Sequence, residues 1–178
     1  MICTLHLSAC VSSKQFFRLV EGSESESTSN YPTNVYKVKI SETISAHLWL
    51  HDGFEEPANL TAVLNIPKET TANLVNNTIK IISGTHVQLL KIAEISTPSN
   101  LVVKFNETLT GNSYEQFTLF GYKSIPDGYL LKLENAKFEV LSNNFSIQFP
   151  DMNINGKTIT PPIYKFVKDK RLHLITIN

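Results

Sequence analysis

The sequence predicts an all-β fold in which residues 1–178 form one domain, an antiparallel two-sheet β-sandwich. Three observations predict it. Turn residues followed by alternating β-branched and aromatic residues recur along most of the chain, only one segment favours a helix, and strands do not alternate with helices. We favour a jelly roll over an immunoglobulin-like Greek key, because Cys3 and Cys10 cannot supply the Cys–Trp–Cys pattern of the latter.

The candidate strands of the first half share alternating apolar positions and flanking turn residues. They are residues 3–9, 14–20, 35–40, 44–50, 60–66, 78–83 and 86–95. Between the second and the third lies a Ser-rich acidic stretch at 21–34, interpreted as a long loop because too few residues precede it to build a core. Residues 66–75 are the one helix candidate, since Pro67 ahead of Lys68 and Glu69 suits a first helical turn.

The second half shows the strand pattern more clearly, and its candidate strands are residues 101–105, 114–123, 129–134, 137–141, 145–149, 163–167 and 171–177. Pro126-Asp127-Gly128 predicts a hairpin between the second and third of these, because Pro presets φ and Gly accepts a positive φ. Asn155-Gly156 predicts another, of the type I′ turn that matches strand twist. Residues 168–170 are expected to turn ahead of the last strand.

The charge pattern argues against a nucleic-acid partner. Lys and Arg total 16 and Asp and Glu total 16, so the formal net charge is zero, and the basic residues are scattered. The largest basic group surrounds Asp169 and consists of Lys165, Lys168, Lys170 and Arg171. We interpret it as a solvated hairpin tip, with a phosphate-contacting patch as the alternative.

No membrane partner is expected, because no stretch reaches the about 18 apolar residues of a membrane span. Residues 7–10 have the look of a lipoprotein cleavage box, but no Lys or Arg precedes Lys14 and His6 interrupts the apolar run, so no signal peptide is expected. Cys3 and Cys10 would lie roughly 23 Å apart on one strand, which predicts free thiols rather than a disulfide.

The residues most suggestive of chemistry are His47 and His51, which flank Trp49 and precede Asp52. On a strand these histidines lie roughly 13 Å apart, too far to share one metal ion. No nucleophile elbow or phosphate-binding glycine pattern is present. We therefore expect no catalytic residue, no metal and no cofactor. Paired carboxylates remain an alternative in which acids from separate strands converge, with Glu107, Glu115, Glu134 and Glu139 as the candidates.

Aromatic residues gather in the second half of the chain, where most of them suit core packing. Tyr122 and Tyr129, on either side of the Pro-Asp-Gly sequence, are candidates for an exposed platform that binds a ligand such as a sugar.

The last strand candidate carries neither Pro nor a charge after Arg171, although exposed strand edges usually carry such protection. We expect it to pair either within its own sheet, beside the first strand, or with a neighbouring subunit. The residues assigned to this assembly strand are Leu172, His173, Leu174, Ile175 and Ile177.

These observations predict a non-enzymatic structural protein that assembles with copies of itself or with other subunits, such as a viral coat, minor capsid or appendage protein. Fold analogy supplies the examples. The localisation is open, with a virion or another assembly favoured. The alternative is an extracellular module that binds a carbohydrate or a receptor through its aromatic loops.

Overall fold

The computed structural model describes residues 10–21, 35–51, 57–97, 101–111, 113–118, 121–126 and 128–175. Side-chain positions are described for residues 17–20, 35–50, 57–97, 101–111 and 128–169. No helix occurs among these residues, and every pairing between their strands is antiparallel. The all-β, antiparallel prediction is therefore confirmed.

The described residues form seventeen strands. In chain order they are β1 (Cys10–Glu21), β2 (Val35–Lys39), β3 (Ser45–His51), β4 (Ala58–Asn65), β5 (Thr71–Leu74), β6 (Thr78–Ser83), β7 (His86–Ser96), β8 (Val102–Val103), β9 (Leu109–Thr110), β10 (Ser113–Thr118), β11 (Gly121–Pro126), β12 (Gly128–Leu133), β13 (Lys137–Phe138), β14 (Asn144–Gln148), β15 (Met152–Ile154), β16 (Lys157–Ile159) and β17 (Ile163–Ile175).

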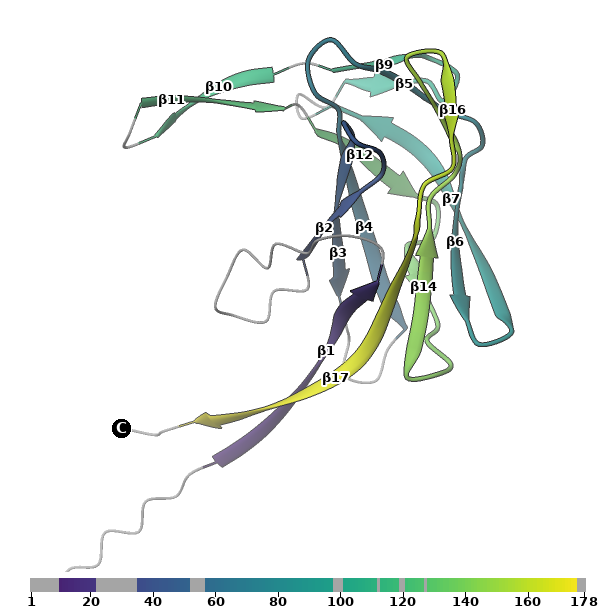
Figure 1. The fold of residues 1–178 in the computed structure, drawn as a ribbon. Coiled ribbons are helices and arrows are strands. Elements are labelled where there is room, and N and C mark those ends of the chain that lie inside the picture. Colours follow the sequence, from purple (N-terminus) through teal and green to yellow (C-terminus); the bar gives the residue numbers. More distant parts are fainter. Residues whose placement is uncertain are drawn as a thin grey trace, which may run out of the picture.

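The largest sheet has the strand order β1-β17-β14-β6-β7-β12-β4-β3-β2, with β13 beside β4 and β8 beside β7. Strand β7 pairs with β6 over its first half and with β12 over its second half, where the register shifts between Lys132 and Leu133. Such an irregularity lets a strand bend and increases its twist. Figure 1 shows the result, a sheet that curls strongly and almost closes on itself.

The curl encloses the core, because alternate residues of each strand face inward. Strand β4 alternates buried and half-buried positions along its whole length. Aromatic rings join strands that lie far apart in the sheet order: Tyr36 of β2 packs 5.2 Å from Phe166 of β17, and Phe138 of β13 packs 5.4 Å from Phe145 of β14. These contacts pack the two ends of the sheet against each other.

A smaller sheet has the order β16-β15-β5-β9. Its hairpin between β15 and β16 turns at Asn155 and Gly156, whose φ angles are 49° and 82°. The hairpin predicted from Asn-Gly is confirmed, since both residues tolerate the positive φ that the turn requires.

The helix predicted within residues 66–75 is wrong. The amide of Thr70 donates to the Pro67 carbonyl at 3.1 Å and Glu69 has a φ of 66°, so the chain makes a tight turn there. Strand β5 follows, and its alternation buries Ala72 and Leu74. Inward packing at every second residue therefore outweighs the local helix signal.

The hairpin predicted at Pro126-Asp127-Gly128 is also wrong. Strand β12 has β4 on one side and β7 on the other, so neither edge is open to β11. Strand β11 pairs instead with β10, and the single strand predicted at 114–123 is therefore two strands with a reversal between Thr118 and Gly121. Asp127 itself lies outside the described residues.

The finer fold predictions are not confirmed. A two-sheet sandwich requires separate sheets packed face to face, whereas one continuous path of paired strands joins β1 to β2. The jelly-roll topology is likewise not confirmed.

Candidate assembly surface

The last strand finds its partner within its own chain. Strand β17 is continuous from Ile163 to Ile175 and pairs with β1 from Lys165 to Ile175, with Lys168 opposite Phe17 and His173 opposite Ser12. The turn predicted at 168–170 is therefore wrong, because β1 offers a partner edge straight through that stretch. Of the two arrangements predicted for the last strand, pairing beside the first strand is the one observed.

The predicted assembly residues occupy the far end of this pairing. Their register partners in β1 are Ser13 for Leu172, Ser12 for His173, Val11 for Leu174 and Cys10 for Ile175. Ile177 and Cys3 lie outside the described residues.

Beyond Val167 the other edge of β17 has no strand beside it in the part of the chain that the structure describes. Strand β14 pairs with β17 from Ile163 to Val167, and the last contact on this side is the Lys168 amide, which donates to the Asn143 carbonyl at 2.7 Å. Residues 10–17 of β1 and 168–175 of β17 therefore form a two-stranded ribbon. Figure 1 shows this ribbon extending away from the curled sheet.

Backbone alternation assigns the open edge of the ribbon to particular residues. In an antiparallel pair the N–H and C=O groups of one residue point to the same side, and successive residues alternate. Because the Lys168 amide points toward β14, the amides of Lys170, Leu172 and Leu174 point toward the open edge. Those of Arg171 and His173 point toward β1.

The inner face of this half of the sheet is apolar. Phe17, Leu19, Phe145, Tyr164 and Phe166 are buried on the inner face. The outer positions of β1, β17, β14 and β6 follow from the register, since directly paired residues share a face.

Those outer positions form a surface that we call the basic face. Among the described side chains of β1, β17, β14 and β6, it carries three basic residues against one acidic one. The basic residues are Arg18, Lys80 and Lys165, and the acidic one is Asp169.

Within the basic face the Arg18 Nε donates to the Asp169 carboxylate at 3.2 Å, with both side chains about half exposed. An exposed pair of this kind contributes about 0–1 kcal/mol, so it does little to hold the strands together. Register places Lys14 directly opposite Arg171 in the backbone pairing.

Sequence reasoning missed Lys14 and Arg18 as part of the basic group. The signal was present: they are four residues apart on one predicted strand and so share a face. It became meaningful only with the pairing of β1 and β17, which long-range register decides.

Two buried tyrosines anchor the base of the ribbon. The Tyr164 hydroxyl of β17 donates to the Lys39 carbonyl at the end of β2 at 2.6 Å. Burial raises the pKa of Tyr164 strongly, and it raises the pKa of Tyr36 to about 12. Both rings therefore stay protonated, and the Tyr164 hydroxyl remains a hydrogen-bond donor to the Lys39 carbonyl.

The predicted histidine pair occupies one strand, β3, as expected. The Asn65 amide donates to Nδ1 of His47 at 3.0 Å, and the ring lies 5.9 Å from that of Trp49. Burial, and secondarily the positive charge of Lys37, lower the pKa of His47. Among the described side chains, no group of three or more His, Cys, Asp or Glu residues is arranged to hold a metal ion.

The predicted aromatic platform does not form at Tyr129. This residue is only 7% exposed, and its hydroxyl donates to the Thr110 carbonyl at 2.7 Å. Tyr129 is therefore a core residue with its polar end satisfied. Tyr122 lies on β11 opposite Phe117, and its side chain is outside the described set.

Surface hollows lined by described residues border several strands. One of about 330 Å³ contains the ion pair of Lys91 and Glu134, and one of about 290 Å³ lies between β7 and β8. A third, of about 420 Å³, lies between residues 41–43 and the hairpin of β15 and β16, with Glu42 as its carboxylate.

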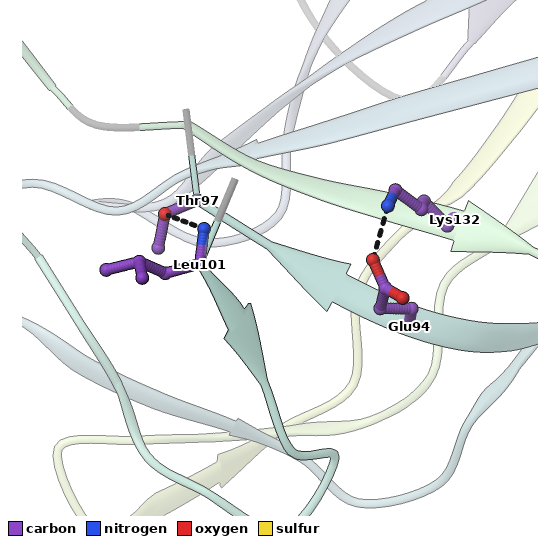
Figure 2. Close-up of polar contacts among 4 residues, drawn as sticks. All are labelled: Glu94, Thr97, Leu101 and Lys132. Carbon is purple, nitrogen blue, oxygen red and sulfur yellow. Dashed lines mark hydrogen bonds and ion pairs between the residues drawn. The ribbon is translucent and has the colours of Figure 1, made fainter. Parts of the chain in front are cut away.

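Further polar contacts lie near the hollow between β7 and β8. Figure 2 shows Lys132 of β12 paired with Glu94 of β7, and the Leu101 amide donating to the Thr97 hydroxyl at 3.2 Å. Of the four candidate carboxylates, Glu107 accepts from the Lys104 amide, and the side chain of Glu115 is outside the described set.

Comparisons with family models, with curated proteins and with solved structures found no match. Among the described residues, no helix is long and apolar enough to cross a membrane. Function is therefore argued from the geometry of the chain itself.

Proposed function

We propose that this chain is a non-enzymatic structural protein that assembles with copies of itself through the open edge of the ribbon. The observation that carries the proposal is the one-sided pairing of residues 168–175 of β17. An open strand edge presents unpaired backbone groups, and another strand pairs with such an edge readily.

The size of the edge supports the proposal. At about 3.4 Å per residue, residues 168–175 offer an edge about 27 Å long, longer than a typical strand of five or six residues. The charged residues of this stretch are confined to 168–171, so residues 172–175 carry no charge that would block an added strand.

Shells, coats and appendages are the assemblies that such a subunit suits, with viral coat or minor capsid proteins as the examples by fold analogy. A two-sheet sandwich of the jelly-roll kind is part of the same proposal. Packing of Tyr36 on Phe166 and of Phe138 on Phe145 supports it, because these rings join strands that lie far apart in the order of the sheet. Burial of Tyr129 removes half of the platform on which carbohydrate binding would rest.

The test is the native mass of the chain, measured by light scattering after size exclusion, with variants of one edge residue. Leu172→Pro removes an amide that points toward the open edge and leaves the bonds to β1 in place. Leu172→Ala is the matched control, because it shortens the side chain and keeps the amide.

We expect the intact chain and Leu172→Ala to form a large species, and Leu172→Pro to be a folded, smaller species with the same far-ultraviolet circular dichroism. An intact chain that stays monomeric at high concentration would contradict the proposal. So would a large species that persists in Leu172→Pro.

A further inference from the structure

Trp49 is the single tryptophan of the chain, and it lies on the outer face of β3, away from the core. Its neighbours Leu48 and Leu50 are fully buried, so the alternation of the strand places Trp49 on the opposite face. Strand β3 has β2 on one side and β4 on the other, so Trp49 is central in the sheet. Its side chain is half-buried, which means that its neighbours hold the ring while part of it reaches solvent.

Polar side chains surround the Trp49 ring on this face. Thr61 of β4 is directly opposite Trp49, and His47 is two residues away on β3, so the three share one face. The His47 ring lies 5.9 Å from the Trp49 ring. Because Asn65 donates to Nδ1 of His47, the neutral imidazole carries its proton on Nε2. Burial, and secondarily the charge of Lys37, lower the pKa of His47, so the ring is neutral at pH 7.

Three of these polar groups have no partner within the part of the chain that the structure describes. They are the Trp49 indole N–H, the Thr61 hydroxyl and Nε2 of His47. Among the described side chains, only Asn59 and Asn153 have a buried polar atom without a hydrogen-bond partner. The three groups around Trp49 therefore reach solvent, where a ligand can pair with them.

Asn59 supplies an acceptor on the same face. It lies two residues before Thr61 on β4, and its Oδ1 is the buried atom without a partner. A buried acceptor that lacks a donor is unfavourable. The terminal torsion of an asparagine is broad, so rotation about it would present this amide to a ligand above the sheet.

We propose that the outer face of β3 and β4 around Trp49 binds a neutral pyranose ring of a carbohydrate. A pyranose has a face of C–H groups, which stacks on an aromatic ring, and a rim of hydroxyls, which both donate and accept hydrogen bonds. Trp49 suits the C–H face, and Thr61, His47 and Asn59 suit the hydroxyls. A fully apolar ligand would leave those polar groups unpaired. The site is apart from the ribbon, so this proposal goes beyond the proposed assembly and does not depend on it.

The test uses Trp49 as its own reporter, because all tryptophan emission of the chain comes from this residue. The full chain is titrated with cellotriose, chitotriose and lactose, and emission is recorded with and without acrylamide as a quencher. Glycerol at the same hydroxyl concentration is the control for effects of any polyol. We expect a saturable shift to shorter wavelength and weaker quenching with at least one carbohydrate, with a Kd of about 1 mM or tighter. Glycerol should give no saturable change.

Calorimetric titration of variants assigns the binding to this face. Thr61→Val keeps the shape of the side chain and removes the hydroxyl, so the Kd should rise about three- to tenfold. Trp49→Ala should abolish binding, and Trp49→Phe should retain part of it. Lys37→Gln is the matched control on the same face, because a neutral ligand predicts a change below about twofold. Far-ultraviolet circular dichroism checks that each variant is folded.

Four results would overturn the proposal. No saturable change with any of the three carbohydrates would reject the ligand class. Unchanged affinity in Thr61→Val and Trp49→Phe would place binding elsewhere on the chain. A loss of about tenfold in Lys37→Gln would show an acidic ligand in place of a neutral one. Emission that acrylamide cannot quench in the chain alone would show that the face is already covered.

Discussion

Phe145 is the buried side chain at the centre of a cluster of aromatic rings inside the curled sheet. It is 2% exposed, and its ring lies 4.9 Å from Phe17, 5.1 Å from Phe166 and 5.4 Å from Phe138. Truncation of such a residue to Ala loses the transfer free energy of the ring and leaves a cavity. We therefore expect Phe145→Ala to lower the free energy of unfolding by about 3–5 kcal/mol.

For a chain of this size a loss of 1 kcal/mol lowers Tm by about 2–4 °C, so the expected decrease is about 6–20 °C. Urea titration and calorimetry at one fixed protein concentration measure it, because assembly makes Tm depend on concentration. Leu101→Ala is the control: this side chain is 67% exposed, and its truncation should cost less than about 0.5 kcal/mol.

A double-mutant cycle of Phe138→Ala and Phe145→Ala separates direct packing from a general loss of core. Phe138 belongs to β13, which pairs with β4, whereas Phe145 belongs to β14, which pairs with β17. Contact across the curled sheet predicts a coupling free energy of about 0.5–1.5 kcal/mol. A coupling near zero, or a loss below about 1 kcal/mol in Phe145→Ala, would refute this account of the core.

Two further predictions concern backbone space and acid sensitivity. A Cβ at Gly111 would lie 1.7 Å from the Pro67 carbonyl oxygen, so Gly111→Ala should cost at least about 3 kcal/mol by urea unfolding. Gly84→Ala, with a φ of 61° and open space around it, should cost about 1–2 kcal/mol, and equal costs would contradict the placement of Gly111. The lowered pKa of His47 means that the unfolded chain takes up its proton first as pH falls through 6.5. Stability should therefore decrease more between pH 7 and pH 5 in the unmodified chain than in His47→Gln, and an identical decrease would contradict the burial of this ring.

Alternation of apolar residues was enough to predict most strands, because inward packing at every second position is a local property. Residues 78–83 form β6 as predicted, and β2, β3, β7, β12 and β14 each lie within one or two residues of their predicted ranges. The signal is strong here since each strand places one face in the core and the other outward.

The errors come from long-range pairing, which local sequence does not contain. Pro126 and Gly128 suit a tight turn, yet β12 is occupied on both edges by β4 and β7. Lys168 and Asp169 suit a turn as well, but β1 continues opposite them and keeps the strand straight. Which edge is free is decided by partners distant in the sequence, such as Asn65 opposite Gly128 and Phe17 opposite Lys168.

The candidate site was predictable only in part. The sequence showed that the last strand lacks the Pro or charged residues that usually protect a strand edge. It also gave pairing with the first strand as one of two possible arrangements. The sequence could not give the register that sets Lys14 opposite Arg171. Nor could it show that the pairing between β14 and β17 ends at Val167, which leaves one edge of the ribbon open.

Amide hydrogen exchange along β17 tests most directly the claim that this edge pairs with a second chain. The amides of Arg171 and His173 point toward β1 and should be protected at every protein concentration. We predict that the amides of Lys170, Leu172 and Leu174 exchange rapidly in dilute protein and become protected as the concentration rises and the chain assembles. Rapid exchange at these three amides in the assembled state would contradict the account.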